Sequence, residues 1–427
     1  MNTTATAPCS TALTAFRQLL YPRGDQDPFP LYKTLRDVAP VLSNPPFLRN
    51  GIVLSRYQDC SAALRNRVLV PIPGGGINPI SSGEPSGVQL ASRWLVYQHG
   101  TRHTGMRNTI ATHFARDRIN DLRGFIEDAA ERRIEGLASG ADAHQVVDLV
   151  ETLLLPFPVS IISHIIGIED SAAQSLGWAG RALSGVLEPL KTPSLTRRIN
   201  NGAVQLVQFF TEAASQRRAE PRNDLLSSLA QQSASDSASD GQELISNLSF
   251  VFCAGYDSST SFLGTAVRTL LDHPDQAAAL RDGKVAPRTA VAELLRYDPP
   301  VHMTARVANE PVCIGGEDVP AGTLVWILLG SANRDPELLD RPDQLDITRT
   351  PVPNLAFSAG PHFCLGTHLA MMEAEVLLPR LLCRFPGMRL AQSPRYRSPG
   401  TAVRGIDHLP VILGQAATRN HHRNGAR

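Results

Sequence analysis

The chain has 427 residues, with 41 lysine and arginine residues against 40 aspartate and glutamate residues and a formal net charge of +1 at pH 7. This balance gives no argument for a nucleic-acid surface. Hydrophobic residues make up 42% of the chain, enough for a sizeable core, and no apolar run approaches the roughly 20 residues that span a bilayer.

The cysteines are scattered, with no CxxC pair and no clustering typical of a disulfide framework. The N-terminal residues lack the charged-then-apolar order of a signal peptide. We therefore expect a protein of the reducing cytoplasm without membrane contact. The six cysteines are Cys9, Cys60, Cys253, Cys313, Cys364 and Cys383.

The N-terminal region is predicted to begin with a mobile tail over residues 1–14 and short helices over 15–38. Residues 40–44 and 51–55 predict a β-hairpin, because two apolar runs flank Pro-Pro and Asn-Gly. A helix over about 56–66 is expected next.

A glycine- and proline-rich stretch follows at residues 71–87. A loop of this length inside a domain is typical of a lid, a binding loop or a disordered segment. A phosphate cradle is disfavoured because Gly-Lys-Ser/Thr does not follow the three consecutive glycines.

From about 104 to 230 the apolar spacing predicts almost only helices. The low-complexity stretch 231–240 is predicted to be a solvated loop. The expected helical segments are 117–138, 145–167 with interruptions at Pro156 and Pro158, 171–187 and 199–218.

Residues 242–273 predict one uninterrupted helix, about 50 Å long, that runs through the interior. Gly255 lies in its middle, where glycine costs about 1 kcal/mol relative to alanine. Two explanations stay open for it. One is a close helix crossing; the other is a local opening that lets Asp257 and Ser258 meet a ligand.

After residue 299 the pattern changes to short strands separated by turns. The end of the chain, 414–427, is polar and expected to be frayed. The predicted strands are 304–308, 312–314 and 323–329, followed by an irregular meander over 333–349 and a second small hairpin over 395–413.

Cys364 has a setting that suits metal ligation. It precedes a strongly helical pattern, so unpaired N–H groups and the positive end of a helix dipole are expected to favour its thiolate. Gly366 carries no Cβ, which lets a flat, bulky group approach the backbone. A thiolate is one of the protein ligands that hold haem iron. A buried structural thiol is the ordinary alternative for a lone cysteine.

The spacing Phe357-x-x-Gly360-x-x-x-Cys364-x-Gly366 resembles the haem-binding signature of the cytochromes P450. By this resemblance Cys364 would be the axial ligand of the iron, and Phe357, Gly360 and Gly366 would contact the haem.

Glu293 and Arg296 lie three residues apart on one predicted helix, about 70 residues before the cysteine loop. Such pairs are usually solvated surface contacts. This one resembles the Glu-x-x-Arg pair of the family, a structural ion pair that holds the meander. The resemblance implies a further arginine, either Arg334 or Arg349.

The segment Ala254-Gly255-Tyr-Asp257-Ser258 resembles the family's segment above the haem. By resemblance Ala254 and Gly255 contact the cofactor, Asp257 relays protons as a general acid, and the Ser258 hydroxyl holds water near dioxygen. Threonine is usual at the position of Ser258. Serine keeps the hydroxyl but loses the methyl group that restricts its rotamer.

Haem propionates need cationic partners in a buried pocket. Matching by motif suggests His103, Arg107, Arg306 and His362 for this role, and for each of them a surface position is the ordinary alternative.

Three departures from the family pattern stand out in the sequence. His99-Gly-Thr101 replaces the usual Asp-Pro-Pro, Ser358 replaces a common glycine, and Met371 replaces a frequent arginine. We expect the last two to lie near the redox-partner face and to alter docking there.

The resemblance covers about residues 15–413 and implies one haem domain of the soluble bacterial P450 type. Its fold would be mainly α with small β-sheets, the P450 prism, with a long central helix crossing the haem and the cysteine loop on the proximal side. The implied cofactor is haem b (iron protoporphyrin IX). The implied partners are O2, a small-molecule substrate, ferredoxin and ferredoxin reductase, and the implied state is a monomer.

The implied reaction is a monooxygenase reaction on a small organic substrate, with natural-product (secondary-metabolite) tailoring expected by analogy. One alternative within the family is oxidative aryl coupling or ring closure without oxygen insertion. A more distant one is a haem sensor or carrier without turnover. The residues expected to line the substrate pocket are Phe250, Val251, Val301, Met303 and Val403.

Overall fold

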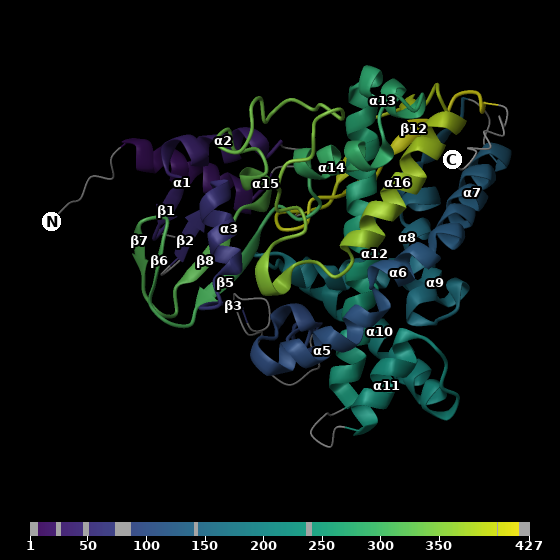
Figure 1. The fold of residues 1–427 in the computed structure, drawn as a ribbon, viewed down its shortest axis with the longest axis horizontal. Coiled ribbons are helices and arrows are strands. Elements are labelled where there is room, and N and C mark those ends of the chain that lie inside the picture. Colours follow the sequence, from purple (N-terminus) through teal and green to yellow (C-terminus); the bar gives the residue numbers. More distant parts are fainter. Residues whose placement is uncertain are drawn as a thin grey trace.

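The computed structural model describes residues 7–22, 27–45, 51–72, 87–140, 144–235, 241–398 and 400–417. Helices dominate one side of the molecule, and the largest sheet lies on the other side with the helices α1 (Ala7–Leu20), α2 (Phe29–Val38) and α3 (Tyr57–Arg65) (Figure 1). The predicted fold class, mainly α with small β-sheets, is confirmed.

Helix α1 begins at Ala7, which corrects the mobile tail predicted over 1–14 for residues 7–14. Residues 1–6 lie outside the described residues. Ala12, Phe16 and Leu19 are buried in a cluster that includes Leu35 of α2. Apolar residues spaced by three or four positions give α1 this buried face, and packing then stabilises the helix.

The largest sheet has five strands in the order β1 (Val41–Ser43), β2 (Gly51–Leu54), β8 (Leu324–Ile327), β5 (Thr304–Ala308) and β3 (Leu69–Pro71). Strands β1 and β2 form the predicted antiparallel hairpin, whereas β2 and β8 are parallel. All four residues of β2 are buried, as expected for a strand covered on both faces. The sheet therefore joins the two ends of the chain.

The helical side is organised around α12 (Gly241–Asp272), which packs against helices from before and after it in the chain. The other helices of this side are α4 (Gly87–Ala91), α5 (Gly100–His113), α6 (Arg116–Asp121), α7 (Arg123–Gly140), α8 (Pro156–Ile166), α9 (Asp170–Leu183), α10 (Pro193–Ala219), α11 (Leu225–Ser235), α13 (Pro274–Arg281), α14 (Pro287–Tyr297) and α16 (Thr367–Arg384). Short helical turns are η2 (Leu95–Tyr97), η3 (Val150–Leu154), η4 (Ser184–Leu187), α15 (Leu329–Ala332) and η5 (Gly360–His362).

Helix α12 has 32 residues and begins and ends one residue before the predicted bounds. It crosses the helical side from end to end (Figure 1). The helix is continuous through Gly255, where a Cβ atom would overlap Ile162 of α8. Close helix crossing therefore explains this glycine. The alternative of a local opening is wrong, because the helix is unbroken there. Gly255 is partly exposed, and its contact with the cofactor stays a prediction.

The region 104–230 contains two features that the prediction of helices missed. Residues Val146–Asp148 form strand β4, and η3 is a π-helical turn. Strand β4 pairs with β12 (Pro410–Ile412), which also pairs with β9 (Arg389–Leu390). Helix α8 begins at Pro156, so its prolines occupy the first turn, where a missing N–H costs little.

The remaining strands form two small hairpins, β6 (Val312–Ile314) with β7 (Glu317–Val319), and β10 (Arg395–Tyr396) with β11 (Ile406–His408). The prediction of a hairpin over 395–413 is thus correct for β10 and β11 only. Strand β12 instead joins the three-stranded sheet with β4 and β9. Helix α11 reaches Ser235, which corrects the start of the loop predicted over 231–240.

Some predictions concern residues outside the described parts of the chain. These include most of the 71–87 loop and the tail beyond residue 417. Among the described residues no single helix is both long and apolar enough to cross a membrane. One bent pair, Val150–Ile166 with Asp170–Leu187, meets the criteria of length and composition alone.

Candidate functional site

Cys364 lies in the turn between η5 and α16. Its backbone amide donates a hydrogen bond to the carbonyl oxygen of Phe357 at 3.0 Å, which closes the loop. Gly366 caps α16, so the cysteine sits two residues before the cap of a long helix, and the thiol is accessible.

The pKa of the Cys364 thiol is raised overall. Although the sulfur is accessible, protein surrounds it closely enough that burial has the largest effect and raises the pKa. The Gly366 amide, the Thr367 hydroxyl and the Arg107 charge lower it by less. This corrects the expectation that the loop alone favours the thiolate. A coordinating metal ion deprotonates a thiol outright, so a ligand role does not require a low intrinsic pKa.

Two glycines shape the cysteine loop for different reasons. Gly360 has φ +69°, and a Cβ atom there would overlap the carbonyl oxygen of Leu64 in α3. At Gly366 a Cβ atom would lie 3.9 Å from the Cys364 sulfur, with no other neighbour within 4 Å. Gly360 therefore permits packing of the loop, whereas Gly366 keeps the space beside the sulfur open.

Basic side chains from three elements converge beside this loop. His103 of α5 and His362 of η5 have ring centroids 4.3 Å apart. Arg107 of α5 donates a hydrogen bond to the carbonyl oxygen of Phe363 at 2.6 Å. Burial, and then the charges of Arg306, His103, Arg107 and His99, lower the pKa of His362 to about 3. The structure thus brings all four predicted cations together.

Arg306 of β5 is the most buried of these cations, at 5% exposure. Its guanidinium donates to the hydroxyl of Thr304 and the carbonyl of Ala305, and burial lowers its pKa to about 10. No carboxylate of the described residues offsets that burial. Nε2 of His103 is also buried without a hydrogen-bond partner. An unpaired buried cation is costly, so this cluster is suited to an anionic group.

An accessible stripe runs along the middle of the otherwise buried helix α12. Ala254 is exposed, and Phe250 and Ser258 are partly exposed, whereas Val251, Phe252 and Cys253 are buried. The three accessible residues are spaced by four and therefore share one helix face. The Ser258 hydroxyl donates to the carbonyl of Ala254 at 3.1 Å.

Asp257 lies off this stripe, in a buried ion-pair network. Both of its oxygens accept hydrogen bonds from Arg397, at 3.0 and 2.5 Å, and Arg181 of α9 lies 3.8 Å away. Burial would raise the pKa of Asp257, but Arg397 and Arg181 outweigh it, and the net pKa is below the usual value. Asp257 is therefore ionised and held in place.

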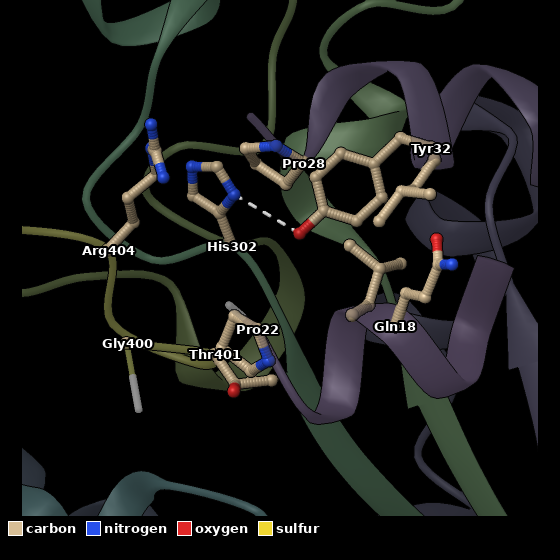
Figure 2. Close-up of a pocket in the computed structure, with 10 residues that line it drawn as sticks. Gln18, Pro22, Pro28, Tyr32, His302, Gly400, Thr401 and Arg404 are labelled. Carbon is tan, nitrogen blue, oxygen red and sulfur yellow. Dashed lines mark hydrogen bonds between the residues drawn. The ribbon is translucent and has the colours of Figure 1, made fainter. Parts of the chain in front are cut away.

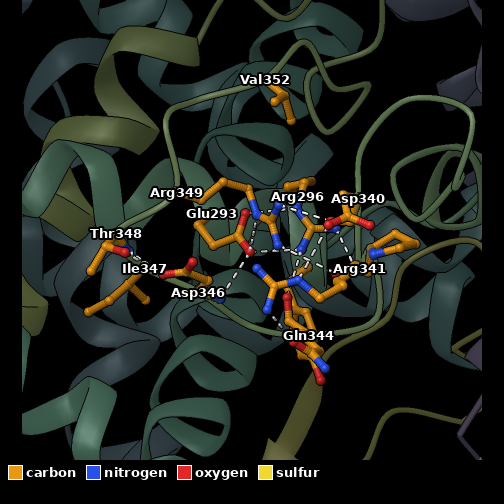
Figure 3. Close-up of polar contacts among 12 residues, drawn as sticks. Glu293, Arg296, Asp340, Arg341, Gln344, Asp346, Ile347, Thr348, Arg349 and Val352 are labelled. Carbon is orange, nitrogen blue, oxygen red and sulfur yellow. Dashed lines mark hydrogen bonds and ion pairs between the residues drawn. The ribbon is translucent and has the colours of Figure 1, made fainter.

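Glu293 and Arg296 form a buried bidentate pair, with both contacts at 2.7 Å (Figure 3). Arg296 also donates to the carbonyl oxygens of Asn333, Pro342 and Gln344 in the meander. The surface-contact alternative is thereby excluded. The pair instead ties α14 to the meander.

Arg349 is the third member of this network, with Nε 3.3 Å from Glu293 Oε1 (Figure 3). Arg334, the other candidate, lies over the rings of Phe29 and Tyr297 instead, with its guanidinium carbon 3.3 and 3.7 Å from their centroids. The structure therefore decides between the two arginines.

Comparison with known proteins identifies the family. Residues 288–392 match the model of the family described as Cytochrome P450. Cytochrome P450 107B1 of Saccharopolyspora erythraea is 36% identical over 73% of this chain and 75% of that protein. The 6-deoxyerythronolide B hydroxylase of the same organism is 32% identical over 90% of this chain and 95% of its own length.

The chain belongs to the cytochrome P450 family. A solved P450 structure, titled as the enzyme CxnD for C–S bond formation in chuangxinmycin biosynthesis, matches with a TM-score of 0.82 and 25% identity over 94% of this chain and 98% of that one. The predicted family and fold are confirmed, and the chain is a P450 enzyme with named hydroxylase relatives.

The described residues fit the haem iron that the P450 family implies. A cysteine thiolate is the axial ligand of P450 haem, and Cys364 is accessible beside the open position at Gly366. The buried Arg306 and the unpartnered Nε2 of His103 suit carboxylates of a bound group. These donors come from α5, β5 and the cysteine loop, which are distant in sequence and which the fold brings together.

The residues predicted to line the substrate pocket of this P450 divide into two groups. Phe250 lies on the accessible stripe of α12, and Val301 is partly exposed and bridges to Val403. Met303 is 2% exposed and packs with α1 and α2. Val251 packs in the main core, and Val403 is 3% exposed. For these three residues the assignment to the pocket stays a prediction.

A small, partly open cavity of about 30 Å³ lies between α1, α2 and residues 400–404 (Figure 2). The Tyr32 hydroxyl donates to Nδ1 of His302, because Nε2 of that ring faces the acceptor Asp298 at 3.0 Å. The cavity has room for roughly one or two water molecules. Two of its lining residues, His302 and Thr401, belong to segments 301–304 and 401–403, which were expected to border the substrate pocket. The cavity is far smaller than a site for an organic substrate.

Three further residues of this P450 site were missed from the sequence. Arg181 and Arg397 hold Asp257, and Glu373 of α16 is completely buried. Asp257 and Arg397 are separated by 140 positions, so no local spacing signals their contact. Met371 is buried in the core, which corrects the expectation that it alters a docking surface.

Proposed function

We propose that this P450 is a haem-thiolate monooxygenase that inserts one oxygen atom of dioxygen into a small organic molecule of natural-product type. The observation that carries the proposal is the accessible thiol of Cys364 beside a cluster of two arginines and two histidines, in which the buried Arg306 has no acidic partner among the described residues. The named function of the hydroxylase relative supports the reaction type.

The cofactor of the proposed reaction is haem b, with Cys364 as its iron ligand. Arg306 and Arg107 would supply positive charge to the two propionates. The rings of His103 and His362, whose pKa values are lowered, would donate N–H hydrogen bonds to them as neutral imidazoles. When bound through a thiolate, the haem supplies the binding of dioxygen and the electron density that promotes O–O cleavage.

Ser258 is proposed to hold water on the accessible face of α12, where its hydroxyl points away from the packed core. Asp257 is proposed to relay protons, as the family resemblance implies. Its bidentate pair with Arg397 must open for that role, because a carboxylate with a lowered pKa holds no proton to donate.

Electrons are proposed to come from a ferredoxin and its reductase, and the site of action is the reducing cytoplasm. The described cysteines support this compartment, because none of Cys60, Cys253, Cys313, Cys364 and Cys383 forms a disulfide.

A second candidate is oxidative ring closure or coupling without retention of oxygen. The structural neighbour CxnD, whose title names C–S bond formation, favours this alternative. The unusual Ser258 is compatible with both reactions.

Product mass separates the two candidates. Compounds are first selected by a shift of the haem spin state on binding, and a hit is then turned over with isotopically labelled dioxygen. Oxygenation predicts a product that gains one labelled oxygen atom. A product that loses two hydrogen atoms and gains no oxygen contradicts the monooxygenase and supports ring closure. Cys364→Ala is the inactive control.

A further inference from the structure

Glu188 is a buried acid in the connection between η4 and α10, and it is 2% exposed. Its carboxylate accepts three hydrogen bonds from the backbone of a segment more than 200 positions away. The amides of Thr401 and Ala402 donate to Oε2 at 2.9 and 3.1 Å, and the amide of Val403 donates to Oε1 at 3.2 Å. Both carboxylate oxygens are therefore engaged by one short stretch of backbone.

Backbone amides, not a cation, hold this carboxylate. The basic residues nearby are engaged with other acceptors. Arg397 donates to both oxygens of Asp257, and Lys191 donates to the backbone carbonyl oxygen of Glu188 at 3.0 Å. A buried carboxylate is costly unless it is hydrogen-bonded, and its bonds to N–H groups are stronger than those of a neutral acceptor. The three bonds therefore fix residues 401–403 relative to Glu188.

The connection that carries Glu188 is itself anchored. A Cβ atom at Gly185 would overlap the side chain of Leu195, so η4 lies directly against the start of α10. The Thr192 hydroxyl accepts a hydrogen bond from the Leu195 amide at 3.1 Å and caps that helix. Leu190 packs against the apolar cluster that contains Ala402. Helix α10 and η4 thus give Glu188 a fixed position.

On its other side, the segment 401–404 pairs with the residues between α14 and β5. The amide of His302 donates to the carbonyl oxygen of Ala402 at 2.8 Å. Val301 forms an antiparallel bridge with Val403. The segment 401–404 therefore lies between Glu188 and this stretch of chain, and hydrogen bonds hold it on both sides.

The stretch that includes Val301 leads into the cation cluster beside Cys364. Strand β5 begins at Thr304, and the Arg306 guanidinium donates to the Thr304 hydroxyl at 3.1 Å. Val301 is partly exposed, whereas Arg306 is 5% exposed. A series of printed backbone contacts therefore runs from Glu188 to the strand that carries the most buried cation of the site. A misplacement of about 1 Å in such a wall can cost about 100-fold in rate.

We propose that Glu188 is a positioning residue for the wall of the site formed by residues 301–306. It fixes the backbone of 401–403, and this segment in turn holds Val301 and the start of β5. Glu188 touches no reacting atom and acts only through these residues. The inference deepens the proposed function and rests on it, because it concerns the wall of the same haem and substrate site.

Amide hydrogen exchange of the haem-loaded protein tests the contact itself. Glu188→Ala is expected to speed the exchange of the amides of 401–403 by at least about tenfold, because all three lose a charged acceptor. Glu188→Gln keeps one acceptor oxygen and should give a smaller increase. The matched control Glu212→Ala removes an exposed acid of α10 and should exchange as wild type does.

Ligand binding tests the effect on the site and needs no identified substrate. Imidazole and 4-phenylimidazole are titrated into the ferric, haem-loaded protein, and the shift of the Soret band gives each dissociation constant. Both ligands bind the iron through nitrogen, but only the phenyl ring extends to the wall. Glu188→Ala is expected to shift the ratio of the two constants several-fold, and Glu188→Asp, which keeps both acceptor oxygens, should restore part of it. Glu212→Ala should keep the wild-type ratio.

The proposal is overturned if Glu188→Ala leaves the exchange of 401–403 at the wild-type rate, or if it changes both dissociation constants by the same factor. If Glu188→Ala does not fold, Glu188→Gln gives the same two readouts with smaller changes. A failure of the proposed function looks different. In that case imidazole causes no Soret shift in the wild-type protein, whereas the exchange of 401–403 still responds to Glu188→Ala.

Discussion

The cysteine loop shows how single residues shape this site. Ser358 has φ +62°, a conformation that L side chains rarely adopt, and its hydroxyl is buried without a hydrogen-bond partner. The sequence shows that serine replaces the glycine common in the family, and the backbone now gives the physical reason for that glycine. Gly360, also at positive φ, has no such strain.

Ser358→Gly is expected to stabilise the folded protein by about 1 kcal/mol. Removing the left-handed strain gains about 1–2 kcal/mol, and the added backbone freedom of glycine costs about 0.5–1 kcal/mol. Urea unfolding of the haem-loaded protein measures the change. Ser175→Gly, at an exposed position of α9, is the control and should destabilise by about 0.5 kcal/mol. If the free energy of unfolding of Ser358→Gly is equal to or lower than that of wild type, the backbone at Ser358 is not strained.

The network at Asp257 shows how elements are joined across the chain. Arg397 of the segment after β10 and Arg181 of α9 both face a carboxylate of α12. Breaking a buried pair by removing one partner leaves an uncompensated charge and costs about 3–5 kcal/mol. The C-terminal hairpin is therefore tied to the central helix by charge as well as by packing.

Arg397→Met is expected to lower the free energy of unfolding by about 3–5 kcal/mol at neutral pH. The pKa of Asp257 lies below its usual value, so the pair stabilises the protein above the unfolded pKa of about 3.9 and loses this effect as pH falls through the folded pKa. The difference in free energy of unfolding between wild type and Arg397→Met should therefore be smaller at acidic pH than at neutral pH. Urea unfolding at both pH values measures this difference.

Arg395→Met is the matched control for this ion pair, because Arg395 is exposed in the same β-hairpin. It should change stability by less than about 0.5 kcal/mol. If Arg397→Met lowers the free energy of unfolding by the same amount at neutral and acidic pH, then packing, not the ion pair, holds the hairpin to α12.

Sequence patterns predicted the elements well where the signal is local. The periodicity located α12 within one residue, and strands β5 and β6 have the predicted bounds. Strand β4 was missed because its partner β12 lies at the far end of the chain. The arginine partners of Asp257 were missed for the same reason, since an ion pair between distant segments leaves no spacing in the sequence.

At the scale of the whole molecule, the site is assembled from distant segments around α12. The cations come from α5, β5 and η5, and the fold brings them beside Cys364. Motif spacing predicted these residues individually. It did not predict how individual pocket candidates pack. Met303, which lies just before β5, packs toward α1 and α2, and contacts between such distant segments leave no pattern in the sequence.

The carbon monoxide spectrum of the reduced, haem-loaded protein tests the central claim most directly. Ligation of the iron by the Cys364 thiolate predicts the strongly red-shifted Soret band of a thiolate-bound haem, and Cys364→Ala should abolish it. Cys383→Ala, which changes another exposed cysteine, should leave the band in place. A wild-type spectrum without the red shift, or an unchanged spectrum in Cys364→Ala, would contradict the account.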